Sequence, residues 1–196
     1  SPRQHAYKAE SQENVRSVDG RAGYRPAKPK APEIDSDVTG RELDSATSRQ
    51  LRALESRNAA TVAKHLVMTG RYLELDPQFA LEHAVAASRS AGRISAVREA
   101  VGVAAYVAED YELALRELRT HRRISGSLDH LALLVDCERA LNRISKALDM
   151  IEEAKREELP AQVRVELAIV ESGIYADQGK KSQAISALQI PQLNPK

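Results

Sequence analysis

The stretch Leu113-Ala-Leu-Arg-Glu-Leu118 has three counterparts along the chain, each with an alanine, an aliphatic residue and then Ala, Leu or Ile at the same places. The counterparts are Phe79-Ala-Leu-Glu-His-Ala84, Lys146-Ala-Leu-Asp-Met-Ile151 and Gln183-Ala-Ile-Ser-Ala-Leu188. The shared alanines are Ala80, Ala114, Ala147 and Ala184, so they are 34, 33 and 37 residues apart. A period of about 34 residues is typical of helix pairs that bury their apolar faces by stacking on neighbours. The repeat therefore predicts closely packed helix pairs.

Residues that start and stop helices mark the expected boundaries. Thr39 and Glu42 fit a capping box that opens a helix to about Leu54. Asp76-Pro77 and Leu159-Pro160 place a proline at the first turn of a helix. Glycines stand where helices are expected to end in the left-handed conformation: Gly70, Gly92, Gly126 and Gly179. Because no segment alternates apolar and polar residues for the length of a strand, we predict an all-α fold.

Residues from about 56 to 190 resemble four tetratricopeptide (TPR) units. In the second unit Gly102 stands at the small position of the motif, Asp110-Tyr111 in its turn, and Ala114 and Leu118 at its packing positions. The first unit is degenerate, and no unit carries the Trp of the motif. The resemblance implies a right-handed α-solenoid of about four helix pairs, with units at about 56–92, 94–126, 128–158 and 160–190. The whole chain also resembles bacterial TPR proteins that have a variable basic N-terminal tail.

The two ends of the chain lack the repeat. Residues 1–38 carry few apolar side chains and are expected to form a disordered tail, basic at first and then acidic. Residues 39–55 are expected to form a capping helix ahead of the repeats. Residues 191–196 form a short C-terminal tail whose two prolines exclude the amphipathic helix that usually covers a last repeat.

The C-terminal edge is therefore expected to be incompletely covered. Its apolar residues are Ala184, Ile185, Leu188 and Ile190. The chain could be cut short here, or Leu193 could fold back over the edge. We favour a third explanation, a weak homodimer in which two copies bury equivalent edges about a two-fold axis.

Composition narrows the class of protein. The chain has 196 residues, a mass of 21.5 kDa and a net charge of +1. This charge argues against a protein that binds nucleic acid or a membrane through its whole surface. A single cysteine, Cys137, excludes a disulfide framework. No run approaches the ~18 apolar residues of a membrane span, and no secretory signal is visible, so we expect a cytoplasmic protein without membrane association.

The TPR resemblance implies a binding groove along the first helix of each pair. The groove positions carried over from the family are His65, Thr69, Tyr72, Glu99, Val103, Tyr106, Asp136, Arg139 and Ile169, followed by Gly173 and Asp177. Two tyrosines over a floor of mixed charge suit a peptide-like segment, although Tyr72 and Tyr106 could instead fill gaps between helix pairs. The residues that clamp chaperone tails in some TPR proteins are absent.

Two basic regions favour an alternative, an RNA- or ribosome-associated factor. One helix face carries a row that could bind an anionic partner or simply be solvated: Arg116, Arg119, Arg122 and Arg123. The tail carries residues that could contact RNA or serve as ordinary linker charge: Arg16, Arg21, Tyr24, Arg25, Lys28 and Lys30.

Signals for catalysis are weak. The five histidines show neither H-x-x-x-H nor H-E-x-x-H spacing, so the sequence predicts no helical metal site. Cys137 stands between Asp136 and Glu138, whose charges raise a thiol pKa, and it is expected to be a packed residue. We therefore predict a non-enzymatic protein without a cofactor, a scaffold or adaptor that binds a peptide-like segment of another protein.

Overall fold

The computed structural model describes residues 30–193, whose regular secondary structure is all helical with no strand, so the predicted all-α class is confirmed. None of the helices in this range is both long and apolar enough to cross a membrane. The compact unit that begins at Ala31 holds them all. The helices are α1 (Ser45–Leu51), α2 (Ser56–Tyr72), α3 (Pro77–Ala91), α4 (Ser95–Val107), α5 (Tyr111–Ser125), α6 (Leu131–Ala140), α7 (Ile144–Ala154), α8 (Ala161–Asp177) and α9 (Lys181–Ala187).

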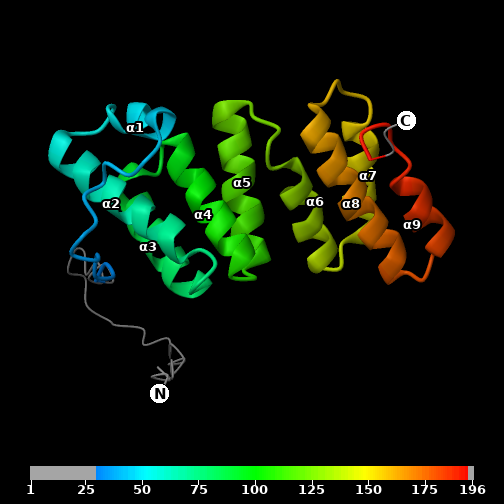
Figure 1. The fold of residues 1–196 in the computed structure, drawn as a ribbon, viewed down its shortest axis with the longest axis horizontal. Helices are drawn as coiled ribbons and strands as arrows, with labels where there is room; N and C mark the ends of the chain where they lie inside the picture. The colour runs from blue at the N-terminus through cyan, green and yellow to red at the C-terminus, as the bar shows by residue number, and fades with distance from the viewer. Residues whose placement is uncertain (1–29, 194–196) are drawn as a thin grey trace, which may run out of the picture. The chain divides into compact units, whose positions relative to one another are not determined.

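Helices α2 to α9 pack in chain order. Helix α2 packs on α3, α4 on α5, α6 on α7 and α8 on α9. Successive pairs meet through α3 and α4, through α5 and α6, and through α6 and α8. Figure 1 shows this order from α2 in cyan to α9 in red. The helices of each pair thus pack on each other, and each pair also packs on the pairs before and after it.

The same turn joins the two helices in three of these pairs. The turn has three residues, and its middle residue is left-handed: Glu109, Asn142 and Gly179 have φ values of 62°, 58° and 73°. In each turn the next amide donates a hydrogen bond of 2.8–2.9 Å to the carbonyl five residues earlier, which closes the end of the first helix. The repeat seen in the sequence is therefore also a repeat of backbone geometry.

Two of the four glycine stops differ from prediction. Gly126 and Gly179 are left-handed as expected, with φ of 72° and 73°. Gly70 instead lies inside α2, and Gly92 ends α3 with a right-handed φ of −65°. Arg98 donates a hydrogen bond of 2.6 Å to the Gly92 carbonyl, so this helix end is satisfied without a left-handed turn.

Helix α1 is shorter than predicted. It begins at Ser45 rather than at Thr39, because the Asp44 side chain accepts hydrogen bonds of 2.8 and 2.9 Å from two amides of the first turn. The Thr39 amide does donate to the Glu42 carboxylate at 2.9 Å, as a capping box requires. Gly40, however, has a φ of 87°, so these residues form a turn instead of a helix.

The end of the predicted tail, residues 31–38, is ordered against α2. Arg71 donates hydrogen bonds of 2.8 Å to Asp35 and of 2.9 and 2.8 Å to Asp37. The prediction of disorder is therefore wrong for this stretch, because its acidic side chains find a cation on the neighbouring helix. The earlier part of the predicted tail, residues 1–29, lies outside the described residues.

Small residues let the paired helices approach closely. The four repeat alanines are all buried, as the repeat predicts. Between α4 and α5 the approach is closest at Gly102, where a Cβ atom would lie 2.6 Å from both Cγ and Cδ2 of Leu118 and 3.1 Å from its backbone nitrogen. Leu118 is fully buried and cannot move aside at little cost.

We expect Gly102→Ala to lower the free energy of unfolding by about 1–3 kcal/mol, because the added methyl group overlaps Leu118. Gly70→Ala is the matched control, since nothing lies within 4 Å of that Cβ position. Alanine favours a helix interior, so this control should gain about 0.5–1 kcal/mol. Urea unfolding of both variants measures the two changes, and a loss of stability in Gly70→Ala would contradict the explanation.

Candidate functional site

The first two predicted groove residues are buried, which corrects that part of the prediction. His65 Nδ1 lies 2.8 Å from Nδ1 of His83, and the Thr69 hydroxyl donates to the His65 carbonyl at 2.9 Å. His65 faces His83 of α3, and both His65 and Thr69 are buried, so they do not line an open groove.

The two buried imidazoles share one hydrogen bond, so only one of the facing nitrogens carries a proton. Burial, and secondarily the repulsion that a protonated His65 would exert, lowers the pKa of His83 to about 4. Burial and the charge of Arg89 also lower the pKa of His65. His83 Nε2 is buried without a hydrogen-bond partner in the described part of the chain. This pair is neutral at physiological pH.

The Tyr72 side chain contacts the protein's own segment around Asp35. Its hydroxyl donates to Asp35 at 3.1 Å, and its ring packs edge-on against Phe79 with centroids 4.9 Å apart. Tyr72 therefore has intramolecular partners at the place where a peptide anchor was expected.

A line of polar contacts joins α4, α6 and α8 through four predicted groove residues. The Tyr106 hydroxyl donates to Asp136 at 2.6 Å, and Arg139 donates to Asp136 at 2.8 Å and to Asp177 at 2.7 Å. A Cβ atom at Gly173 would lie 3.0 Å from the Arg139 guanidinium, so glycine permits this approach. Burial and the Asp136 hydrogen bond raise the pKa of Tyr106. The structure brings these residues together, but their polar groups bond to one another rather than facing a partner.

The other predicted groove residues do not form one surface. Val103 is half-buried against the core between α4 and α5. Ile169 is an exposed apolar side chain on α8, with 54% of its surface accessible. Glu99 binds His130, as described below.

Two arginines of the predicted basic face pair with buried glutamates. Arg116 lies 3.0 Å from Glu117, which Arg98 also contacts at 2.5 Å. Arg119 forms an ion pair with the fully buried Glu138. The rest of this face, Arg122 and Arg123, lies in the last turn of α5, where positive charge favours the helix end.

Glu138 connects three helices. Lys146 lies 2.9 Å from its carboxylate, and Arg143 lies 3.5 Å away, in addition to Arg119. Burial alone would raise the pKa of Glu138, but the hydrogen bonds from Lys146 and Arg119 outweigh it and hold the pKa below its ordinary value. Two of the four arginines on the predicted face thus have carboxylate partners within the fold.

The predicted tail contacts cannot be placed at the site. Lys30 is exposed. The others lie outside the described residues: Arg16, Arg21, Tyr24, Arg25 and Lys28.

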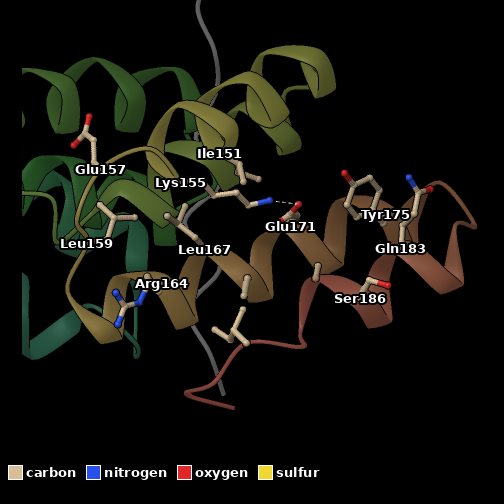
Figure 2. A pocket seen from close by; sticks show the side chains of 13 residues that line it. Ile151, Lys155, Glu157, Leu159, Arg164, Leu167, Glu171, Tyr175, Gln183 and Ser186 are labelled. Carbon is tan, nitrogen blue, oxygen red and sulfur yellow. Dashed lines mark hydrogen bonds and ion pairs between the residues drawn. The ribbon is translucent and has the colours of Figure 1, made fainter. Parts of the chain in front are cut away.

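A cavity of about 430 Å³ opens between α7, α8 and α9 (Figure 2). Ile151, Leu159 and Leu167 give it apolar walls. Lys155 and Glu171 form an ion pair of 2.9 Å across it. The remaining polar side chains of the lining are Glu157, Arg164, Tyr175, Gln183 and Ser186.

Sequence reasoning pointed to the C-terminal region but missed this cavity. Of the apolar residues expected at the edge, only Ile185 is exposed, with 62% of its surface accessible, whereas Ala184 is buried and Leu188 and Ile190 are partly buried. The cavity itself depends on side chains from three helices that are individually typical of core positions. No single motif could have indicated it.

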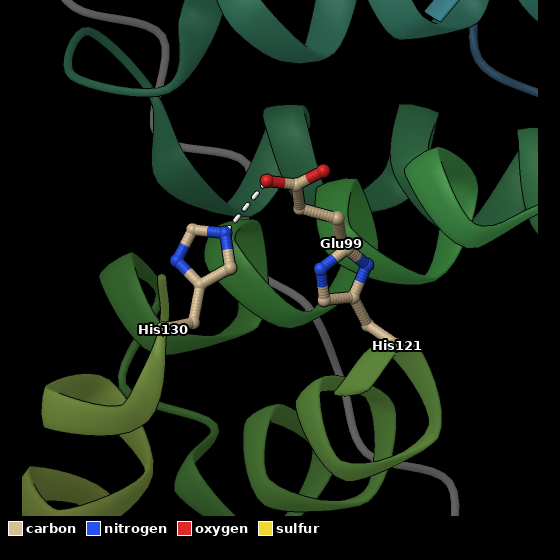
Figure 3. Close-up of side chains that lie close together, drawn as sticks. All are labelled: Glu99, His121 and His130. Carbon is tan, nitrogen blue, oxygen red and sulfur yellow. Dashed lines mark hydrogen bonds and ion pairs between the residues drawn. The ribbon is translucent and has the colours of Figure 1, made fainter. Parts of the chain in front are cut away.

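A second cluster, also missed, contains Glu99 of α4, His121 of α5 and His130 just before α6 (Figure 3). One ligand atom from each lies within 4.8 Å of the others. His130 Nε2 lies 2.6 Å from Glu99, an interaction that raises the pKa of His130 and lowers the pKa of Glu99. The histidine spacing rules test residues on one helix, so they could not find this arrangement.

Cys137 is fully buried, as predicted. Burial, followed by the charges of Asp136 and Glu138, raises the pKa of its thiol to about 12. The thiol is therefore protonated and unreactive at physiological pH.

Comparison with models of known protein families finds no match, and comparison with curated proteins finds none either. The TPR resemblance therefore remains a prediction made from the residues themselves.

We expect the buried histidine pair to make the fold sensitive to mild acid. Unfolded His83 takes up a proton near pH 6.5, whereas folded His83 stays neutral down to about 4. The unfolded state therefore binds more protons between these values, and lowering the pH from 7.5 to 5 should cost about 2 kcal/mol of stability. Urea unfolding at both pH values should show a smaller loss in His83→Gln than in the wild type. Equal losses would contradict the assignment.

Proposed function

We propose that the protein is a non-enzymatic, cytoplasmic interaction scaffold that binds a peptide-like segment of a partner protein in the cavity between α7, α8 and α9. One observation carries the proposal, the combination of apolar walls and a polar rim around about 430 Å³. Pockets that hold ligands or anchoring side chains have this size and this chemistry. The partner segment would insert an apolar side chain between Leu159 and Leu167.

The charges around the cavity favour an apolar anchor over a charged one. Lys155 and Glu171 neutralise each other at 2.9 Å, and the lining also holds one further cation, Arg164, and one further anion, Glu157. A charged ligand that reached Lys155 or Glu171 would have to displace the other member of this ion pair. An apolar side chain would pack against the apolar walls without displacing an ion pair. Gln183 and Ser186 of α9 would form hydrogen bonds with the peptide backbone.

The fold is best interpreted as a TPR-like α-solenoid. The stacking of helix pairs in chain order, the recurring three-residue turn and the buried repeat alanines support this interpretation. The binding surface, however, differs from the groove that the family implies. Most groove positions have partners within the chain, and the cavity lies on another stripe of α8 from Ile169 and Gly173.

The contacts of the basic face weigh against the rival function, RNA binding. Arg116 and Arg119 are engaged by Glu117 and Glu138, which reduces the charge they can offer to phosphates. An RNA-associated role would rest on the remaining arginines and on the basic residues of the N-terminal region.

Selection from a displayed peptide library tests the proposal on the full chain. We expect the enriched peptides to share an apolar anchor and to bind with weak salt dependence. Ala187→Trp should fill the cavity and weaken binding at least about tenfold, because the anchor loses its pocket. Ala176→Trp is the matched control, since Ala176 is an exposed residue of α8 outside the cavity lining, and it should bind like the wild type.

Three outcomes would contradict the proposal. Unchanged binding by Ala187→Trp would place the peptide elsewhere. A nuclease-sensitive partner bound with steep salt dependence would support the RNA-associated alternative. A dimer in light scattering that Ile185→Glu disrupts, without enriched peptides, would assign the C-terminal edge to self-association.

A further inference from the structure

The cluster of Glu99, His121 and His130 has the donor set of a metal site. Two imidazoles and one carboxylate are the three protein ligands of many zinc sites in which water completes a tetrahedron. The ligand atoms lie within 4.8 Å of one another, whereas ligands at about 2.0–2.1 Å from a tetrahedral ion lie roughly 3.3 Å apart. Shifts of about 1.5 Å or less in side-chain position would close the site.

His121 is already oriented as a ligand. Its Nδ1 lies 3.1 Å from the Ser95 carbonyl and 2.9 Å from the Ser95 hydroxyl. A proton on Nδ1 donates to that carbonyl, which leaves the lone pair on Nε2, the arrangement usual for metal-binding histidines. The Ser125 hydroxyl donates its proton to the His121 carbonyl at 2.9 Å. Its oxygen lies 3.4 Å from His121 Nε2, so this weaker contact leaves Nε2 available to a metal ion.

The other two ligands can move to meet an ion. The side chains of His130 and Glu99 are 22% and 41% accessible, while His121 is buried and fixed by Ser95. Figure 3 shows the Glu99 carboxylate bonded to His130 with His121 beside it. The proton in this hydrogen bond would leave to solvent when an ion takes its place. Asp129 and Glu166 add negative charge near His130, which favours a cation.

We propose that Glu99, His121 and His130 bind a zinc ion that links α4 and α5 to the start of α6. The ion would join the second helix pair to the third across the turn at Gly126. The other histidine pair, His65 and His83, is no equivalent site, because no carboxylate completes a metal-ligand cluster there among the described residues. This site is independent of the proposed peptide cavity.

The test is a titration of the full chain, first stripped with a chelator, with Zn²⁺ in competition with a chromophoric chelator. We expect one ion per chain and, at a hundredfold excess over Kd, a rise in melting temperature of roughly 5–10 °C. Co²⁺ in place of Zn²⁺ should give the intense visible absorption of a four-coordinate site.

Three variants make the test specific. Glu99→Gln and His130→Gln should each weaken binding at least about tenfold and reduce the melting shift. Asp129→Asn removes a nearby charge but no ligand, and should change the affinity less than about fivefold. Circular dichroism establishes that each variant keeps its helices. Absence of stoichiometric binding, or binding that Glu99→Gln and His130→Gln leave unchanged, would overturn the proposal.

Discussion

Close contact between paired helices depends on a small residue at a fixed place. Ala80, Ala114 and Ala147 are completely buried, and Gly102 lies against Leu118 where a methyl group would not fit. With aromatic residues making up only 4% of the chain, the core is built mainly from Ala, Val and Leu. Many short-range contacts must replace a few large side chains, so the helices have to pack tightly to bury enough surface.

Buried carboxylates link neighbouring helices through ion pairs. Glu117 of α5 binds Arg98 of α4, and Glu138 of α6 binds Arg119 of α5 at the same separation of 19 residues. Glu171 of α8 binds Lys155 just after α7. Each glutamate is buried with at least one cation beside it, so removing the glutamate, or all the cations around it, would leave a charge without compensation. The ion pairs therefore constrain how one helix is placed against the next.

Among residues 30–193, this packing leaves few side chains free for binding. The polar stripe on α4, α6 and α8 is satisfied internally by Arg139, and α2 is covered in part by the segment around Asp35. Space remains where the repeat ends, between α7, α8 and α9. Near the contacts of α4, α5 and the start of α6, the partly accessible side chains of Glu99 and His130 bond to each other and could bind an ion instead. Each candidate site is formed by side chains from three successive parts of the fold, α7 to α9 for the cavity and α4 to the start of α6 for the cluster.

Spacing and composition alone specify the helical class, the buried repeat alanines and the cap at Asp76, because these follow from local propensity and periodicity. They also specify that Cys137 is packed and unreactive. They do not specify that residues 31–38 dock on Arg71, that His65 is buried, or that Glu99 meets two histidines. Those outcomes depend on how each helix is rotated and packed against its neighbours. Only the tertiary structure decides this, because side chains far apart in sequence meet only once the helices are packed.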